Sequence, residues 1–285
     1  MASSLVPVID GLAFAEGPRW HDGRLWFSDM HAHRVVALDP DGGTAETIVE
    51  VPGQPSGLGW RPDGTLLVVS MTDRRLLAHV DGALEEVADL SGLAPSHCND
   101  MVVDAAGNAY VGNFGFDLHD PEADQRTTNL VLVTADGDVR VVADDLFFPN
   151  GAVITPDGET LIVGESFGGG LTAFDIDDDG GLSNRREWAR VTGSVPDGIC
   201  LDAEGAVWMA SPISNRVLRV AEGGEVLDEV RTSDERQPFA CMLGGSDRTT
   251  LFVCTAIDSE PETCRRLRSG RIESSQVDVP GAGRP

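Results

Sequence analysis

A pattern that recurs six times along the chain constrains its fold more than any other sequence feature. Each copy has a short, mostly apolar run, a turn such as PDG, AEG or AAG, and a second apolar run. The first residues of successive copies are 40, 43, 51, 47 and 43 positions apart. The copies are EGPRWHDGRLWFSD from Glu16, SGLGWRPDGTLLVVS from Ser56, NDMVVDAAGNAYVGN from Asn99, NGAVITPDGETLIVGES from Asn150, DGICLDAEGAVWMAS from Asp197 and the degenerate ACMLGGSDRTTLFVCT from Ala240.

Each copy predicts a β-hairpin, because two apolar runs flank a turn whose glycine favours a positive φ. A third apolar run follows in most copies, and a fourth follows in some, as at 45–51 and 139–144. Four strands per unit and six such units are typical of a β-propeller. No window has sustained helical periodicity. We therefore expect an all-β chain that forms one six-bladed β-propeller domain over residues 1–285.

The sixth copy lacks an obvious fourth strand of its own. We expect LVPVI (5–9) or RIESSQVDV (271–279) to complete that blade and to close the ring.

Equivalent positions of successive blades form a ring around the central channel of a propeller, so the first residues of the copies should meet there. Two carboxylates and two amides among them offer oxygen ligands, and two negative charges match a divalent cation such as Ca²⁺. Asn, Asp and Ser also open turns before strands, which is the simpler explanation for any one of them. Glu is a poor turn residue, so Glu16 favours a metal site in the channel. The ring residues are Glu16, Ser56, Asn99, Asn150, Asp197 and Ala240.

The blade starts resemble those of the gluconolactonase / senescence marker protein (regucalcin) family, in order and over essentially the whole chain. The motifs that carry the resemblance are AEGPRW (15–20), HCNDM (97–101), FPNGAVITPDG (148–158), VPDGICLDAEG (195–205) and ACMLGGSDRTTLFVCT (240–255). The resemblance implies a six-bladed propeller with a divalent ion in its channel, held by Glu16, Asn150 and Asp197. It also implies that Asn99 lies close to the metal and the substrate.

One position departs from the sugar lactonases of that family. They usually carry an arginine two residues before the asparagine that matches Asn99, where it contacts the substrate, and this chain has His97 there. An imidazole can donate a hydrogen bond, but it lacks the bidentate fork of a guanidinium group. We predict that His97 and Asn99 bind the substrate. The resemblance supports the metal site better than it supports an aldonolactone as substrate.

Composition excludes several classes of chemistry and partner. All 21 cationic side chains are arginines, so there is no lysine for a Schiff base or a P-loop. The net charge of −26 should repel nucleic acids and anionic membrane surfaces. The start MASSLVPVIDG has no signal-peptide pattern, and no apolar run approaches the length of a membrane span. Five cysteines without a CxxC pair predict a reduced, cytoplasmic protein.

Two further motifs lack the context that their chemistry needs. Residues 164–168 read G-x-S-x-G, but a nucleophile elbow requires a helix after its serine, and a glycine-rich turn and a strand follow Ser166. Residues 175–180 match half of an EF-hand loop, but the twelfth position is Arg186 and no helices flank it. We expect a hairpin turn at 175–180, whereas Ser166 could line the channel.

Other side chains leave alternatives open. His31 and His33 could lie on one face of a strand, but no third soft ligand follows nearby, so a zinc site is not expected. His31 either edges the substrate pocket or lies on the surface. Cys98 should point away from His97 on an extended strand and pack inside its blade. A group of phenylalanines forms either an apolar lip over the channel or packing between blades. These are Phe114, Phe116, Phe147 and Phe148.

With the resemblance, these residues predict a metal-dependent hydrolase that opens a cyclic ester. The ion would polarise the carbonyl group of a lactone, and Asp197 would act as general base, because Ca²⁺ lowers the pKa of bound water little. Ca²⁺ is the expected ion, with Zn²⁺, Mn²⁺ and Mg²⁺ as alternatives. Two other functions stay open: a related ester or organophosphate hydrolase, and a propeller that binds calcium or a ligand without chemistry.

Overall fold

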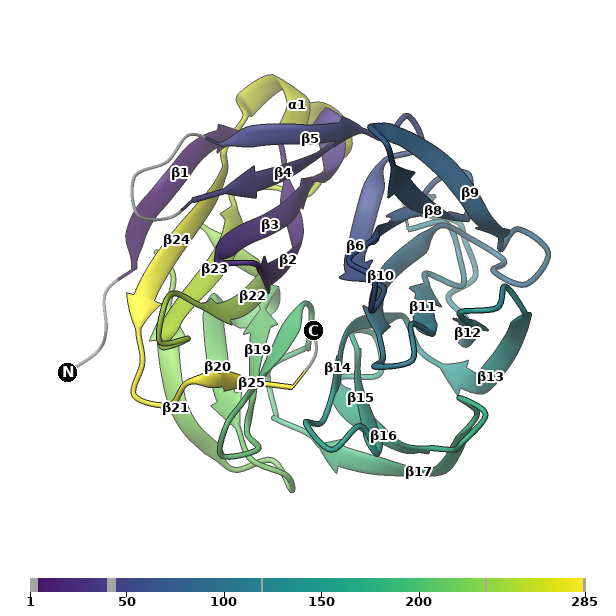
Figure 1. Ribbon diagram of the computed structural model, residues 1–285. Coiled ribbons are helices and arrows are strands. Elements are labelled where there is room, and N and C mark those ends of the chain that lie inside the picture. Colours follow the sequence, from purple (N-terminus) through teal and green to yellow (C-terminus); the bar gives the residue numbers. More distant parts are fainter. Residues whose placement is uncertain (1–4, 40–44, 119, 234, 284–285) are drawn as a thin grey trace.

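The computed structural model describes residues 5–39, 45–118, 120–233 and 235–283. Six antiparallel β-sheets surround a central axis and form a six-bladed β-propeller, as predicted (Figure 1). In blades one to five the strands follow the chain outward from the axis, because a hairpin joins each strand to the next.

The strand bounds place five blades in the order of the repeats. Blade one is β2 (Ala15–His21), β3 (Arg24–Asp29), β4 (Arg34–Leu38) and β5 (Glu46–Glu50), and blade two is β6 (Pro55–Trp60), β7 (Leu66–Ser70), β8 (Arg75–Val80) and β9 (Ala83–Asp89). Blade three is β10 (Cys98–Val103), β11 (Ala109–Asn113), β12 (Thr128–Val133) and β13 (Val139–Leu146), and blade four is β14 (Pro149–Ile154), β15 (Thr160–Glu165), β16 (Gly170–Ile176) and β17 (Leu182–Ala189). Blade five is β18 (Ile199–Asp202), β19 (Val207–Ser211), β20 (Arg216–Val220) and β21 (Val226–Arg231).

Blade six is built from both ends of the chain. It contains β22 (Gln237–Gly244), β23 (Thr250–Ala256), β24 (Gly270–Gln276) and, outermost, β1 (Val6–Leu12). Both segments expected to complete this blade do so, since β24 is its third strand and β1 its fourth. A two-residue strand, β25 (Gly281–Ala282), pairs with β18 and adds to blade five, which the sequence patterns did not predict.

The turns of the first five hairpins have the predicted conformation. Their glycines have φ values between +74° and +91°, a region that side chains with a Cβ rarely adopt. These glycines are Gly23, Gly64, Gly107, Gly158 and Gly205.

Among the described residues, helical structure is confined to short connections. The 3₁₀ turns η1 (Met30–Ala32) and η2 (Pro212–Ser214) each follow a second strand, and the α-helix α1 (Pro261–Leu267) links β23 to β24. The Glu260 side chain caps α1 by accepting hydrogen bonds from two of its first amides. Across the described ranges, no helix has the length and apolar character needed to cross a membrane.

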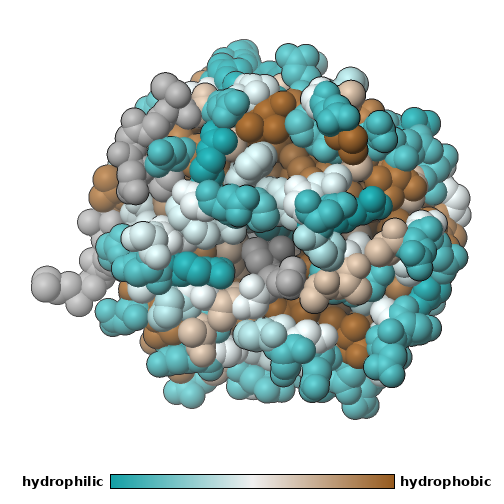
Figure 2. Space-filling model, viewed as in Figure 1, coloured by the Kyte–Doolittle hydropathy of each residue, from teal (hydrophilic) through white to brown (hydrophobic). Residues whose placement is uncertain are grey.

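Apolar side chains fill the spaces between neighbouring blades. Blades three and four, for example, share a cluster that includes Val102, Tyr110 and Leu161. All five cysteines are buried and unpaired, as expected for reduced core residues. On the face shown in Figure 2, hydrophilic residues surround the periphery of the molecule. The apolar packing between neighbouring blades holds the innermost strands in fixed positions around the axis.

Candidate metal and substrate site

The predicted ring residues occupy matching places at one end of the innermost strands. Glu16 and Asn150 are the second residues of β2 and β14, Asn99 is the second residue of β10, and Asp197 lies two residues before β18. These four side chains line one cavity of about 210 Å³. The structure thus brings together the four oxygen donors that the repeats align.

The other two ring positions are closed by packing. Ser56 and Ala240 are buried, and neither is among the described residues that line the cavity. The Ser56 hydroxyl donates to Oδ1 of Asn99 over 3.5 Å, while Nδ2 of Asn99 donates to the Pro149 carbonyl over 3.2 Å. Asn99 is therefore held from two neighbouring blades, with its amide facing the cavity.

Asn150 and Asp197 are joined by a short hydrogen bond. Nδ2 of Asn150 donates to Oδ1 of Asp197 over 2.6 Å and to the Ser166 hydroxyl over 3.1 Å. The Ser166 hydroxyl in turn donates to the Pro196 carbonyl over 2.7 Å. Because the amide nitrogen of Asn150 serves these neighbours, its carbonyl oxygen is the atom left to bind a cation.

The two carboxylates lie where ionisation is unfavourable. Burial, and next the charge of Asp197, raise the pKa of Glu16 well above its ordinary value. Burial raises the pKa of Asp197 to about 8, although the hydrogen bond from Asn150 acts in the opposite direction. A cation between these groups would offset both shifts, because it would stabilise the ionised carboxylates.

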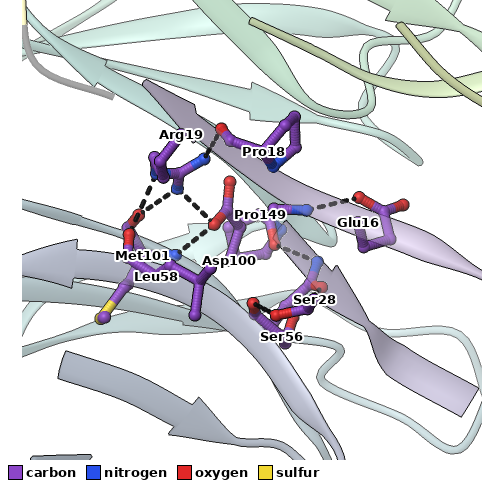
Figure 3. A network of polar contacts seen from close by, with 11 residues as sticks. Glu16, Pro18, Arg19, Ser28, Ser56, Leu58, Asp100, Met101 and Pro149 are labelled. Carbon is purple, nitrogen blue, oxygen red and sulfur yellow. Dashed lines mark hydrogen bonds and ion pairs between the residues drawn. The ribbon is translucent and has the colours of Figure 1, made fainter. Parts of the chain in front are cut away.

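A buried ion pair between Arg19 and Asp100 lies near Glu16 and ties three blades together (Figure 3). Nη2 of Arg19 donates to Oδ1 of Asp100 over 2.6 Å and to the Met101 carbonyl over 2.7 Å. Nε of Arg19 also donates to the Leu58 carbonyl over 3.0 Å. Arg19 comes from β2, Leu58 from β6 and Asp100 from β10, so this guanidinium group fixes the spacing of three inner strands.

The donor set fits a hard divalent cation. Two carboxylates balance its charge, and two amide oxygens are neutral ligands of the kind that Ca²⁺ accepts. Within the part of the chain that the structure describes, no three His, Cys, Asp or Glu side chains form a metal-binding group. The oxygens that could hold an ion therefore come from a mixed set of carboxylates and amides, which suits Ca²⁺, Mg²⁺ or Mn²⁺ better than Zn²⁺.

The two histidines considered from the sequence have different positions. His31 is buried and lines the cavity, so the alternative of a surface histidine is wrong. Its Nδ1 accepts from the Gln54 amide over 3.0 Å, and its Nε2 then donates to the Ser259 carbonyl over 3.3 Å. His97 is not among the described lining residues, and its ring lies 5.9 Å from that of Phe114, which does line the cavity. Substrate binding by His97 stays a prediction.

The remaining motifs have structural roles. Cys98 is buried, as expected, but it packs among apolar side chains of blades two and three rather than inside its own blade alone. Burial raises the pKa of its thiol to about 12, which keeps it protonated. Ser166 lines the cavity but is followed by a turn and β16 rather than by a helix. Residues 175–180 lie at the hairpin between β16 and β17, where the Gly180 amide donates to the Asp177 carbonyl.

The phenylalanines near the channel form one cluster. Phe114 and Phe148 line the cavity, whereas Phe116 and Phe147 pack beside them. The sequence patterns did not point to Phe14 and Phe239, which also line the cavity, across from Phe114 and Phe148. The ring centroids of Phe14 and Phe239 lie 4.7 Å apart. Phe14 lies one residue before β2 and Phe239 is the third residue of β22, and both come one or two residues before a ring position. Their positions relative to the repeat were the available signal.

Fold and site together define a six-bladed propeller with a donor set for a hard ion at one end of its channel. A family model described as SMP-30/gluconolactonase/LRE-like region matches residues 14–257, and the chain belongs to this family. The family resemblance expected from the blade starts is confirmed.

Similar proteins of named function align with this chain over most of both sequences. A 6-deoxy-6-sulfogluconolactonase from Pseudomonas putida is 30% identical over 278 residues, which is 95% of this chain and 93% of that protein. A pentonolactonase from Haloferax volcanii is 28% identical, over 85% of this chain and 81% of its own. Regucalcin from Gallus gallus is 25% identical, over 87% of this chain and 85% of that protein.

Solved structures share the architecture. Regucalcin from Agrobacterium tumefaciens, described as a calcium-binding protein, matches with a TM-score of 0.81 and 21% identity, over 100% of this chain and 96% of that one. A gluconolactonase from Xanthomonas campestris matches with a TM-score of 0.77 and 23% identity, over 98% of this chain and 90% of that one. At these identities the likeness shows the shared fold.

Proposed function

We propose that this protein is a lactonase, a hydrolase that opens a cyclic carboxylic ester with the help of a bound divalent metal ion. The observation that carries the proposal is the pair Glu16 and Asp197, two carboxylates with raised pKa values at the bottom of one cavity, beside two amides. Family membership supports the reaction, since two of the named relatives are lactonases.

Glu16, Asn150 and Asp197 are the proposed ligands of the ion. When bound, a divalent ion supplies positive charge that polarises the ester carbonyl and stabilises the negative charge developing on its oxygen. Ca²⁺ is the proposed ion, because the donors are oxygens of mixed charge and because one structural relative is described as calcium-binding.

Asp197 is the proposed general base. An oxygen of its carboxylate takes a proton from water as the water oxygen attacks the carbonyl carbon. A new C–O bond forms, the C–O bond of the ring breaks, and the proton passes to the leaving oxygen, so the product is a hydroxy acid. The bound ion favours the ionised form of Asp197, and the ionised carboxylate is the form that accepts the proton.

Asn99 is proposed to orient the substrate. Its amide is held by Ser56 and Pro149 and therefore offers a fixed polar group at the cavity floor. Because the side chain of Asn99 is already ordered in the folded protein, no further conformational entropy has to be lost when the substrate binds. His97, beside Phe114, is proposed to act at the edge of the same cavity.

A substrate and metal panel tests the proposal. Protein treated with a chelator is assayed for acid release from lactones, aryl esters and phosphotriesters, alone and after addition of Ca²⁺, Mg²⁺, Mn²⁺ or Zn²⁺. We expect lactone hydrolysis that requires an added ion. Faster hydrolysis of phosphotriesters or aryl esters would assign the protein to the related hydrolases. Ion binding by calorimetry without hydrolysis of any substrate would indicate a binding protein.

We also propose a cytoplasmic location. Five unpaired, buried cysteines support it, because oxidising compartments favour disulfides in secreted proteins. Fractionation of the native host would test it, and recovery in an extracytoplasmic fraction would contradict it.

A further inference from the structure

The walls of the catalytic cavity differ in character from its floor. Its polar floor consists of the four ring side chains, whereas eight of the fifteen described lining residues are apolar, and five of those are phenylalanines. In a chain that carries 47 acidic residues, such a wall is a marked local departure from the average composition. Cavities with apolar walls and a few placed polar groups bind the apolar part of a ligand along the wall.

The phenylalanines form continuous aromatic surfaces rather than scattered contacts. The rings of Phe114 and Phe148 are stacked at 4.5 Å, and Phe167 continues this wall at 5.0 Å from Phe148. On the other side, Phe14 and Phe239 meet edge to face at 4.7 Å. These rings support one another, so the wall keeps its shape when a ligand leaves.

The wall extends to the solvent. Phe167 is 39% exposed and Leu118 is 42% exposed, and both line the cavity. A single exposed apolar side chain is ordinary, but these two line the same cavity and add exposed apolar surface to its wall. A ligand that covers them would remove this apolar surface from water.

Two of the three polar side chains of the wall, those of His31 and Ser166, are already engaged with the protein, and the third, Ser259, is exposed to solvent. Both ring nitrogens of His31 have partners, and the Ser166 hydroxyl donates to a backbone carbonyl. No arginine is among the lining residues of the described chain. A sugar lactone would bury several hydroxyl groups against this wall, and a buried hydroxyl without a partner is strongly disfavoured.

We infer that the substrate is a lactone that carries an alkyl or aryl substituent, rather than a polyhydroxylated sugar lactone. The inference rests on the proposed function, because the carbonyl end must lie on the polar floor. The substituent then extends along Phe114 and Phe148 toward Phe167 and Leu118. The substrate class thus differs from the sugar lactones that the names of two relatives indicate.

A chain-length series tests the inference. kcat/KM is measured with the active metal for γ-butyrolactone and for γ-lactones with unbranched alkyl substituents of increasing length, with glucono-δ-lactone as comparator. Each buried methylene should raise kcat/KM by about fourfold until the cavity is full. The best alkyl lactone should exceed glucono-δ-lactone by at least about tenfold.

Substitutions at the mouth test the location of the substituent. Phe167→Ser should lower kcat/KM for the best alkyl lactone by about tenfold and leave γ-butyrolactone nearly unchanged, because only the longer substrate reaches residue 167. Leu227→Asn is the matched control, since this side chain is 44% exposed on the outermost strand β21 and is not among the cavity residues. This variant should leave kcat/KM unchanged for both substrates.

The outcomes separate this inference from the proposed function. Lactone hydrolysis that is independent of chain length, or fastest with glucono-δ-lactone, would overturn the inference and leave the lactonase proposal intact. An equal loss for both substrates in Phe167→Ser would also overturn it. No hydrolysis of any lactone with any of the four ions would overturn the lactonase proposal itself.

Discussion

Glu16 and Asp197 occupy equivalent positions in blades one and five, yet their surroundings differ. Glu16 accepts a hydrogen bond only from the amide of its neighbour Gly17, over 3.1 Å, among the described contacts. Asp197 accepts from Asn150, which also contacts Ser166. Asp197 thus belongs to a hydrogen-bonded group that can fix its orientation toward a substrate, whereas Glu16 chiefly contributes charge.

The first prediction separates the two carboxylates. Asp197→Asn keeps an oxygen that can coordinate but loses nearly all basicity. We expect kcat at saturating metal to fall by roughly 10²–10⁴, with a modest loss of ion affinity. Calorimetry gives the affinity, and acid release gives the rate.

Glu16→Gln is the matched variant and should behave in the opposite way. Its ion affinity should fall more, because one of two charges is lost, and excess metal should restore much of the rate. Near-normal kcat for Asp197→Asn at saturating metal would leave Asp197 as a ligand only. Full activity of both variants after chelation would refute the metal site.

Residues related by the repeat could be predicted from the sequence, and residues related only by space could not. Glu16, Asn150 and Asp197 fall at one repeat position, so their meeting follows from the symmetry of the blades. Arg19 and Asp100 are 81 residues apart and hold different repeat positions. Their contact depends on how far a side chain reaches across the axis, which no periodicity encodes.

At the scale of the strand, four of the six copies carry a glycine directly after the ring residue: Gly17, Gly57, Gly151 and Gly198. A Cβ on Gly17 would lie 2.8 Å from the Ser56 carbonyl oxygen, and one on Gly151 would lie 2.5 Å from the Ile199 amide nitrogen. Each of these contacts is with the next blade. The missing Cβ therefore allows neighbouring inner strands to approach at the axis.

The second prediction uses Gly57, which follows Ser56 rather than a proposed ligand in the chain. Gly57→Ala would place a Cβ 2.9 Å from the carbonyl carbon of Asp100, and the two inner strands would have to separate. We expect a loss of about 1–3 kcal/mol in the free energy of unfolding, measured by urea denaturation.

Gly92→Ala is the control for this experiment. Its added Cβ would meet no atom within 4 Å, and its φ lies outside the left-handed region. It should be neutral or slightly stabilising. Equal stability of both variants would show that the inner strands can separate without cost.

The predicted hairpins were found because period-two strands and glycine turns are local signals. The helix α1 has seven residues, too few for a helical period, although Pro261 at its first position and the capping Glu260 are typical of a helix start. The strand β25 has two residues and pairs with β18 about 80 positions earlier in the chain. Such a pairing is a property of the assembled ring, and no local pattern marks it.

For the whole molecule, the third prediction concerns pH. Without metal, the pKa of Asp197 is about 8 in the folded state, well above its value in the unfolded chain, and that of Glu16 is raised as well. Between pH 4 and pH 8 the unfolded chain therefore binds fewer protons at these sites than the folded one. Their contribution to stability is present at low pH and is lost as pH rises toward 8.

Ion binding should reverse this dependence, because the ion replaces the protons. We expect the increase in Tm caused by Ca²⁺, relative to chelator, to be larger at pH 8 than at pH 5.5. For one displaced proton, the Kd should rise by about tenfold for each pH unit below 8. Asp197→Asn should reduce this dependence, and an increase in Tm that does not vary with pH would contradict it.

Blade six has a consequence for synthesis on the ribosome. Its outermost strand β1 (Val6–Leu12) is made first, but the strand that it pairs with, β24 (Gly270–Gln276), is made nearly last. A nascent chain that ends before Gly270 therefore holds β1 without its partner, and an unpaired strand edge is prone to association with other chains. Two exposed residues of β1 limit that association while the rest of the ring emerges, because Asp10 carries a charge and Pro7 has no amide hydrogen to donate.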